Sequence, residues 1–255
     1  MDPRLLDRLA ADAWPPLVHR TLGEWELRAS AGVTKRANSV LASGDVADQA
    51  AAVDEAEAFA REHRIPPLLQ VGPPSPAGLP ELLSARGYAP TDRTLVLTGS
   101  VSEALAALPE AAPVRLAPTP DEDWLALWWS VDGRGGAAER AVAERILTGC
   151  PAVYALAVEA GPAATGRLAF VRALDGEPWC GLFGLATRPD SRRRGHASAV
   201  IRELLEEASR RGIERFWLQV LAENAGARRL YAALGCRESS WYEYWRPSPL
   251  PRDAC

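Results

Sequence analysis

The second half of the chain contains two kinds of segment, which differ in the spacing of their apolar residues. Short runs rich in β-branched and aromatic residues are separated by longer stretches in which apolar residues recur every three or four positions. This pattern predicts strands that alternate with helices in a mixed α/β fold. The expected strands lie near 114–116, 152–159, 165–173, 179–187, 215–221 and 240–245, and the expected helices near 121–131, 137–147, 197–211 and 225–234.

The first half shows similar but shorter patterns. Residues 25–29 and 33–41 flank a Ser-Ala-Gly turn and predict a hairpin, which a helix from about 47 to 63 follows. Alternation along the second of these strands would place three polar side chains on one face, namely Thr34, Arg36 and Asn38. That face either turns toward the second half and furnishes a pocket, or it faces water as a polar strand surface.

Two short segments recur at nearly constant spacing. The Leu-Gln-Val triplet at 69–71 returns at 218–220, and the segment that ends at Gly87 parallels the one that ends at Gly235. The pattern indicates a duplicated unit. The stretch 99–113 is rich in Ala, Pro and Ser and is the predicted linker. The expected division is a lobe at 1–98, the linker at 99–113, a second lobe at 114–246 and a tail at 247–255.

Composition narrows the functional classes. The chain has 255 residues, 47% of them hydrophobic, and a formal net charge of -4, which argues against a nucleic-acid binder. No signal-peptide pattern and no long uncharged apolar run occurs, so a cytoplasmic protein is expected. The four cysteines show no C-x-x-C pair and no metal-ligand spacing, which favours reduced thiols and no metal site.

The loop at 192–197 carries the most specific chemistry. It joins an expected strand to an expected helix, where unpaired backbone N–H groups and the helix dipole favour an anion such as pyrophosphate. Gly195 removes a Cβ where the loop must approach phosphates closely, and Ala197 is small at the second tight position. The corresponding positions of the first half are Ser43 and Val46, so only the second half should bind a nucleotide-bearing cofactor.

Several motifs together resemble the acyl-CoA site of the GCN5-related N-acetyltransferases (GNAT). The resemblance covers about 114–246, and the first half resembles the amino-terminal lobe of two-lobed bacterial members. It implies a tandem α/β GNAT fold with a degenerate first lobe, a catalytic second lobe and acetyl-CoA as cosubstrate. The motifs are Leu185-Ala186-Thr187-Arg188-Pro189, Arg192-x-x-Gly195-x-Ala197 and Asn224-x-x-Ala227-x-x-Leu230-Tyr231. The implied cofactor-binding residues are Leu185, Ala186, Thr187, Arg192, Arg193, Arg194, Gly195, His196, Ala197, Ser198, Asn224 and Tyr231.

The resemblance also implies roles for individual groups. The strand end at 185–187 would splay from its neighbour, so that its backbone pairs with the pantetheine arm and polarises the thioester carbonyl. Of the three arginines at 192–194, at least one only solvates the surface. Asn224 either caps a helix or bonds the CoA arm, and the two roles are compatible. Tyr231 occupies the general-acid position, although it could instead serve as core packing with a structural hydrogen bond.

The sequence evidence for the general base is less specific than that for the general acid. No acidic residue occurs within 179–186, so the candidates are Glu177, Asp175 and an ordered water chain, with Glu177 named as the catalytic choice. The glycine-rich loop 130–136 either shapes the acceptor site, through Asp132 or Arg134, or is a solvated connection. Two tryptophans one helical turn apart, at 124 and 128, are expected to fill the core more than to contact substrate.

The predicted function is acetyl transfer from acetyl-CoA to a primary amine, by direct attack in a ternary complex. A small-molecule acceptor is favoured because a closed cleft between lobes suits a metabolite. The alternatives are an acyl-CoA sensor that engages a partner protein, and a protein N-acetyltransferase.

Overall fold

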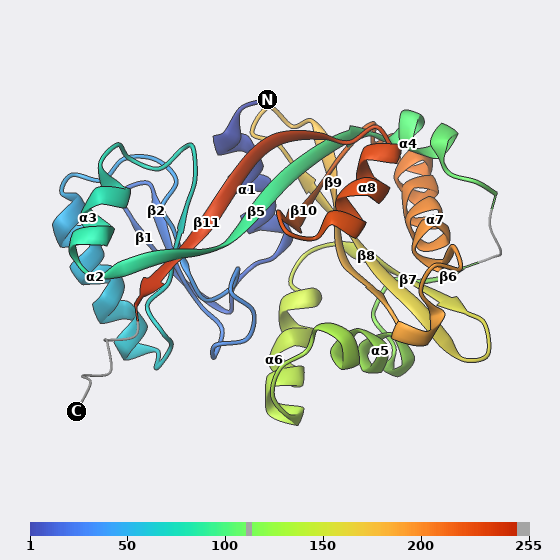
Figure 1. Ribbon diagram of the computed structural model, residues 1–255, viewed down its shortest axis with the longest axis horizontal. Coiled ribbons are helices and arrows are strands. Elements are labelled where there is room, and N and C mark those ends of the chain that lie inside the picture. The colour runs from blue at the N-terminus through green and yellow to red at the C-terminus, as the bar shows by residue number, and fades with distance from the viewer. Residues whose placement is uncertain (111–113, 249–255) are drawn as a thin grey trace.

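Residues 1–110 and 114–248 are described by a computed structural model, in which one continuous sheet runs through both halves of the chain (Figure 1). The sheet has 11 strands in the order β1-β2-β3-β4-β11-β5-β10-β9-β8-β7-β6. The strands are β1 (Val18–Leu22), β2 (Trp25–Ala29), β3 (Val40–Leu41), β4 (Leu69–Val71), β5 (Tyr88–Ser100), β6 (Arg115–Ala117), β7 (Ala152–Val158), β8 (Pro162–Arg172), β9 (Pro178–Thr187), β10 (Arg215–Leu221) and β11 (Arg237–Pro247). The helices are α1 (Pro3–Ala13), α2 (Gln49–Glu62), α3 (Leu79–Ala85), α4 (Val101–Ala107), α5 (Glu122–Asp132), α6 (Ala137–Leu147), α7 (His196–Arg210) and α8 (Ala225–Ala233), with a 3-10 turn at Pro189–Ser191.

The second half follows the sequence prediction closely. Its strands and helices all occur, and the bounds of α6 and β10 agree with the predicted ones. Local signals explain this agreement. The Asn224 side chain accepts a hydrogen bond from Ala227 N at 3.1 Å and so caps α8. Gly235, which follows α8, has a φ of 77°, the left-handed conformation that ends a helix at little cost for glycine.

The predicted hairpin of the first half is wrong in its second strand. Strand β2 pairs antiparallel with β3 as predicted, but β3 contains only Val40 and Leu41 of the segment 33–41, and the tight turn joins β2 to β1 instead. Thr34 has a φ of 61°, which no regular strand accommodates. Thr34, Arg36 and Asn38 therefore lie on a loop and do not share a strand face.

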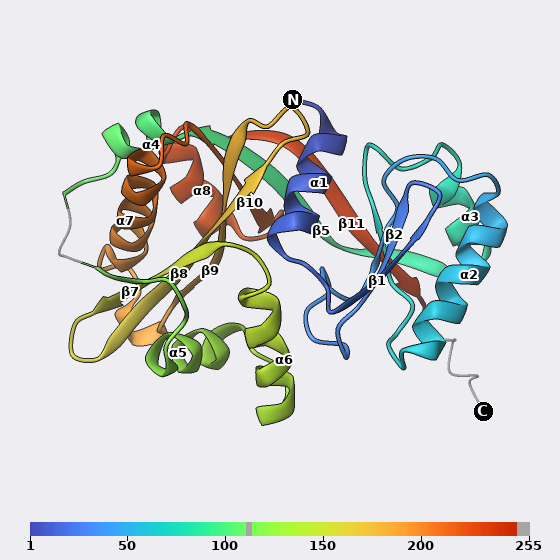
Figure 2. The same cartoon turned by 180° about the vertical axis from the view of Figure 1, so that it is seen from behind.

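Helix α1 is an element that the sequence analysis did not predict. It begins at Pro3, and Asp2 Oδ1 accepts a hydrogen bond from Arg4 N at 2.9 Å as its cap. Its apolar face, with Leu6 and Leu9, belongs to the same apolar cluster as residues of α5 and α6. Figure 2 shows α1 on the near side of the sheet, beside β9 and β11. The amino-terminal segment thus contributes to the core of the second lobe.

The segment predicted as a linker is largely structured. Strand β5 extends to Ser100, and α4 follows at once and packs on α7 through Val101 and Ala104. Its alanine-rich composition suits a helix as well as a linker, which explains the error. Residues 111–113 lie outside the described residues, and so does most of the predicted tail. The division into two lobes stays a prediction.

The two halves exchange their last strands. Strands β3 and β4 are parallel, as are β9 and β10, so each half contains one parallel pair. Yet β4 pairs with β11 and β10 pairs with β5, while β5 and β11 pair with each other at the centre of the sheet. The two long strands cross from one lobe to the other in Figure 1. This crossing fixes the lobes relative to each other.

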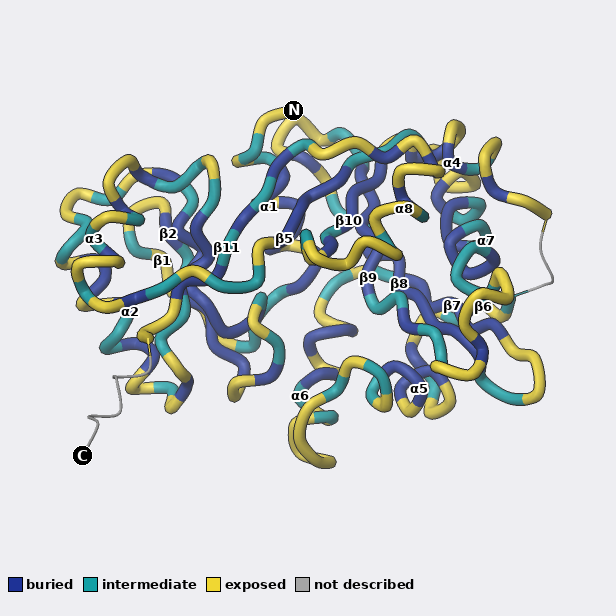
Figure 3. Tube along the Cα trace, in the orientation of Figure 1, coloured by how far each residue is buried: buried dark blue, intermediate teal, exposed yellow. Residues whose placement is uncertain are grey.

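Burial divides into three apolar clusters (Figure 3). One lies in the first lobe between the sheet and helices α2 and α3. A second fills the face of the second-lobe sheet under α4 and α7. The third lies on the opposite face beneath α1, α5 and α6, and it includes Val33 and Ala37 from the first-half loop. That loop is thereby anchored to the second lobe.

Candidate active site

Strands β9 and β10 separate halfway along their length. Their parallel pairing ends at Leu182 and Leu218, although β9 continues to pair with β8 and β10 continues to pair with β5. A bulge at this point supplies the cause, because Gly184 has a φ of 57° and the β8 register shifts opposite it. A Cβ on Gly184 would approach the Trp124 ring at 3.1 Å. The backbone of 183–187 on the β10 side is left without a strand partner, as predicted.

A cavity of about 500 Å³ lies at this separation. Both lobes contribute to its wall, which contains the strand ends, the start of α8 and the first-half loop. Its lining residues are Trp14, Thr34, Lys35, Arg36, Asp92, Thr94, Trp128, Asp132, Leu182, Phe183, Gly184, Leu185, Gln219, Val220, Leu221, Asn224, Ala227, Tyr231, Tyr242 and Tyr244. Its volume is within the range of small-molecule sites.

Tyr231 lies on α8 at the edge of this cavity. Its side chain is buried, and desolvation raises the pKa of the phenol to about 12. Among the described residues its hydroxyl has no hydrogen-bond partner. The phenol is therefore protonated at neutral pH and available to donate. A structural hydrogen bond, the alternative role considered from sequence, is absent from the described part of the chain.

The loop before α7 presents a row of unpaired backbone N–H groups. Arg193 and Gly195 have φ values of 61° and 84°, and α7 begins at the next residue, His196. The first amide that bonds back into the helix is Ala199 N, to Gly195 O at 2.9 Å. Within the described residues, the N–H groups of 192–198 have no protein partner. Glycine at 195 is required by its left-handed backbone, and a Cβ there would meet no atom within 4 Å.

The three arginines of this loop differ in their contacts. Arg194 forms an ion pair with Glu159 at 2.9 Å, which lowers the pKa of that carboxyl, and His196 lies 3.4 Å from the same oxygen. Arg192 donates to Thr187 O at 3.4 Å. Arg193 has no side-chain partner among the described residues. Arg192 and Arg193 thus lack a carboxylate in this part of the chain, whereas the charge of Arg194 is compensated.

Glu177, the named candidate base, is not part of this site. It precedes β9, five residues before the strands separate, which corresponds to roughly 15 Å along a strand. Its carboxylate lies 3.5 Å from Arg215 at the start of β10. Asp175 accepts a hydrogen bond from Glu177 N in the same turn. Both residues were chosen by closeness to the strand in sequence, but they lie at its opposite end.

The helix connection at 130–136 touches the cavity through one residue. Asp132 lines the cavity, and partial desolvation raises its pKa, an effect that Arg134 and Arg36 oppose. Arg134 is exposed and bonds the adjacent Gly133 O. Trp124 and Trp128 are buried and stack at 5.9 Å between ring centroids, as core residues should. Trp128 also forms part of the cavity wall.

The first-half loop reaches the cavity because Asn38 organises it. The buried Asn38 side chain accepts from Ser30 N and Gly32 N at 2.7 and 2.8 Å, and it donates to Val33 O and Thr34 O at 2.6 and 2.8 Å. Lys35 and Arg36 then face the second lobe. Asp92, Gln219, Tyr242 and Tyr244 are cavity residues that sequence reasoning did not find, since no motif marks them.

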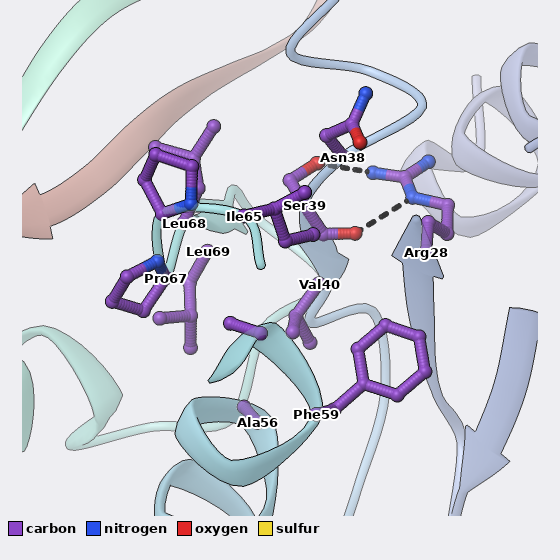
Figure 4. A pocket seen from close by; sticks show the side chains of 12 residues that line it. Arg28, Asn38, Ser39, Val40, Ala56, Phe59, Ile65, Pro67, Leu68 and Leu69 are labelled. Atoms are coloured by element: carbon purple, nitrogen blue, oxygen red, sulfur yellow. Dashed lines mark hydrogen bonds between the residues drawn. The ribbon is translucent and has the colours of Figure 1, made fainter. Parts of the chain in front are cut away.

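A second cavity lies in the first lobe and is far smaller (Figure 4). Its volume of about 10 Å³ suits one water molecule at most. Arg28 at its edge is fully enclosed and donates to Ser39 O at 3.0 Å and to Ser39 Oγ at 2.8 Å. No helix within residues 1–110 and 114–248 has the length and apolarity to cross a bilayer.

Comparison with solved structures identifies the fold. A GCN5-related N-acetyltransferase from Kribbella flavida superposes with a TM-score of 0.66 at 16% identity, covering 97% of each chain. A tandem GNAT protein from the clavulanic acid biosynthesis pathway gives a TM-score of 0.60 at 15% identity, covering 96% of this chain and 88% of that one. The protein therefore has the mixed α/β fold of the GNAT class, as its sequence predicts.

Sequence comparison places it within that class. Residues 2–245 match the family described as probable histone acetyltransferase Rv0428c, C-terminal, and the chain belongs to this family. A Bacillus subtilis (strain 168) protein described as uncharacterized N-acetyltransferase YobR is 29% identical over 248 residues, 95% of this chain and 98% of that protein. The [ribosomal protein bS18]-alanine N-acetyltransferase of Escherichia coli (strain K12) is 37% identical over 72 residues, 28% of this chain and 49% of that enzyme.

Proposed function

We propose that this protein transfers an acetyl group from acetyl-CoA to the primary amine of a small molecule. The observation that carries the proposal is the opening between β9 and β10, which Tyr231 lines. The unpaired amides before α7, the helix that follows β9 in the chain, are a second feature. Acetyltransferases of this fold use acetyl-CoA, and each feature suits a different part of that cosubstrate.

The residues present fit coenzyme A. The unpaired N–H groups of 192–198, at the positive end of α7, suit its pyrophosphate, and Arg192 and Arg193 add charge without a competing carboxylate among the described residues. At 185–187 strand β9 has no strand partner on its β10 side, and this edge suits the amides of the pantetheine arm. Asn224 caps α8, and this role leaves its side-chain N–H₂ available to the arm.

Acetyl-CoA supplies an activated thioester carbonyl. Backbone N–H groups at the β9 bulge would polarise that carbonyl as an amine attacks it. Tyr231 Oη would then donate its proton to the departing sulfur, and the proton lost by the amine nitrogen would return to the phenolate through water. No covalent enzyme intermediate is required, because the amine attacks the thioester directly, and the cavity lining contains no cysteine or serine that would form one.

The position of the cavity between the two halves of the chain favours a small acceptor. Lobes on both sides confine it, and a wall built from Trp14, Trp128 and Tyr242 suits a compact molecule. A protein acceptor is the second candidate, and the local similarity to the bS18-alanine enzyme favours it.

A thiol-release assay distinguishes these functions. The full-length protein is incubated with acetyl-CoA and either a panel of small primary amines or a panel of peptides with free amino termini. We expect turnover with small amines and at most slow turnover with peptides. Faster turnover of peptides would favour protein acetylation. Tight CoA binding by calorimetry without turnover of any amine would instead indicate an acyl-CoA sensor.

A further inference from the structure

Arg36 is a guanidinium without a carboxylate partner on the cavity wall. Its Cζ lies 5.8 Å from the ring centroids of both Trp14 and Phe183, and its Nε donates to Tyr242 Oη at 3.4 Å. These contacts hold the head group in place but use only one of its five N–H donors. No carboxylate of the described residues lies within 4.0 Å of it. An oriented arginine with unused donors suits a carboxylate or a phosphate.

Asp132 is the corresponding unpaired negative charge. It is the last residue of α5, where the helix dipole adds a negative potential, and it lines the same cavity. It forms no ion pair with the described residues, although Arg36 and Arg134 are close enough to lower the pKa of its carboxyl. A carboxylate at a helix carboxyl end suits an ammonium group.

The other two charges of the cavity compensate each other. The ammonium group of Lys35 contacts the Asp92 carboxylate directly. Arg36 and Asp132 remain, and they lie farther apart than a direct ion pair. The cavity thus presents one positive and one negative group with a gap between them.

We propose that the acceptor is a zwitterion, an amine that carries its own carboxylate, with Arg36 binding the carboxylate and Asp132 binding the ammonium group. The ammonium group loses one proton to water before the neutral amine attacks the thioester carbon. This inference rests on the proposed acetylation of a small amine and specifies its substrate class. The amino terminus of a protein has no adjacent carboxylate, so this arrangement also disfavours protein acceptors. The Gln219, Tyr242 and Arg36 side chains form one hydrogen-bonded series, which ties the specificity group to the end of β10.

Matched acceptor pairs test the proposal. The probes are L-amino acids with aliphatic, aromatic and cationic side chains, each paired with its primary amide, which keeps the amine and removes the carboxylate. We expect the wild-type protein to prefer the acids by about 10-fold or more in kcat/KM, as a charged bidentate contact predicts. Arg36→Gln should abolish this preference by raising KM for the acids while leaving the amides unchanged. Asp132→Asn should raise KM for both members of a pair.

A nearby arginine outside the cavity supplies the control. Arg93→Gln also removes one positive charge, but Arg93 pairs with Glu243 and does not line the cavity, so the preference should persist. Equal or better use of the amides by the wild-type protein would overturn the proposal, as would a preference that survives Arg36→Gln.

Binding measurements separate this proposal from the proposed function. The same pairs are titrated into CoA-loaded protein by calorimetry and thermal shift. Preferential binding of the acids that Arg36→Gln abolishes would support the zwitterion site even if no amine were acetylated. Equal binding of acids and amides would overturn it even if other amines were turned over.

Discussion

Leu182 of β9 and Leu218 of β10 are the last residues to pair across these two strands, and beyond them the sheet opens into a cavity. The bulge at Gly184 produces this opening, and Trp124 packs against it with its Nε1 donating to Gly166 O at 3.1 Å. One local irregularity thereby provides unpaired amides and space for a ligand at the same place.

Loss of the Tyr231 hydroxyl should slow catalysis without weakening cofactor binding. Tyr231→Phe keeps the buried ring but removes the proton donor, and we expect kcat to fall about 10²-fold at pH 7. The defect should shrink above about pH 8.5, where a thiolate leaves without a proton. Steady-state kinetics across pH measures both effects. Tyr88→Phe, which removes a hydroxyl bonded to Glu57 far from the cavity, should leave kcat unchanged. An unaltered kcat for Tyr231→Phe would remove this residue from the mechanism.

The two glycines at opposite ends of α7 form a matched pair. Gly195 and Gly212 have φ values of 84° and 69°, and a Cβ on either would meet no atom within 4 Å. Alanine at either site should cost about 1 kcal/mol of unfolding free energy from backbone strain. Only Gly195→Ala should also weaken CoA binding, by about 10-fold or more, because its methyl group occupies the space proposed for the phosphates. Calorimetry and thermal unfolding separate the effects, and equal CoA affinities in the two variants would refute the phosphate assignment.

Asn38 should control the acceptor side of the cavity. Asn38→Ala leaves buried amide and carbonyl groups of the loop 30–34 without partners, and we expect a loss of about 3 kcal/mol in unfolding free energy. If the variant folds, KM for the acceptor should rise while the Kd for CoA stays constant. The control is Gln49→Ala, which removes one exposed hydrogen bond to Ala77 O. It should change neither the unfolding free energy nor the KM for the acceptor. A parallel loss of CoA affinity in Asn38→Ala would contradict this division of roles.

Burial of Asp7 should make stability depend on pH. Desolvation raises the pKa of this α1 carboxyl from 3.8 to about 6, and Ser43 and Arg28 only partly oppose it. The folded state binds the proton more tightly, so the unfolding free energy should fall as pH rises from about 4 to about 6 and stay low above that. Asp7→Asn should therefore stabilise the protein at pH 7.5, by up to about 3 kcal/mol, but not at pH 4.

Denaturant unfolding at the two pH values checks this dependence. The exposed Asp45→Asn is the control and should alter stability little at either pH. Destabilisation of Asp7→Asn at pH 7.5 would show that a charged Asp7 is favourable in the folded state and would contradict the prediction.

Local patterns in the sequence determined much of the second lobe. Helix α7, its preceding loop and the cap of α8 depend on residues a few positions apart, so periodicity and turn chemistry suffice to predict them. The same reasoning failed for the segment 33–39, where polar residues alternate as they do in a strand but the chain forms a loop. There the conformation depends on the hydrogen bonds that the Asn38 side chain accepts and donates, and on packing of Val33 and Ala37 against the second half.

Only the tertiary structure decided which charges share the cavity. Asp92 and Asp132 come from separate lobes, and Glu177 lies at the wrong end of its strand although it is near the site in sequence. The exchange of β5 and β11 between the two halves likewise depends on pairing between residues that lie more than a hundred positions apart in the sequence. The sequence by itself determined the fold class and the loop before α7, because these follow from local periodicity and backbone conformation. The acceptor side was decided by long-range packing, which no local pattern encodes.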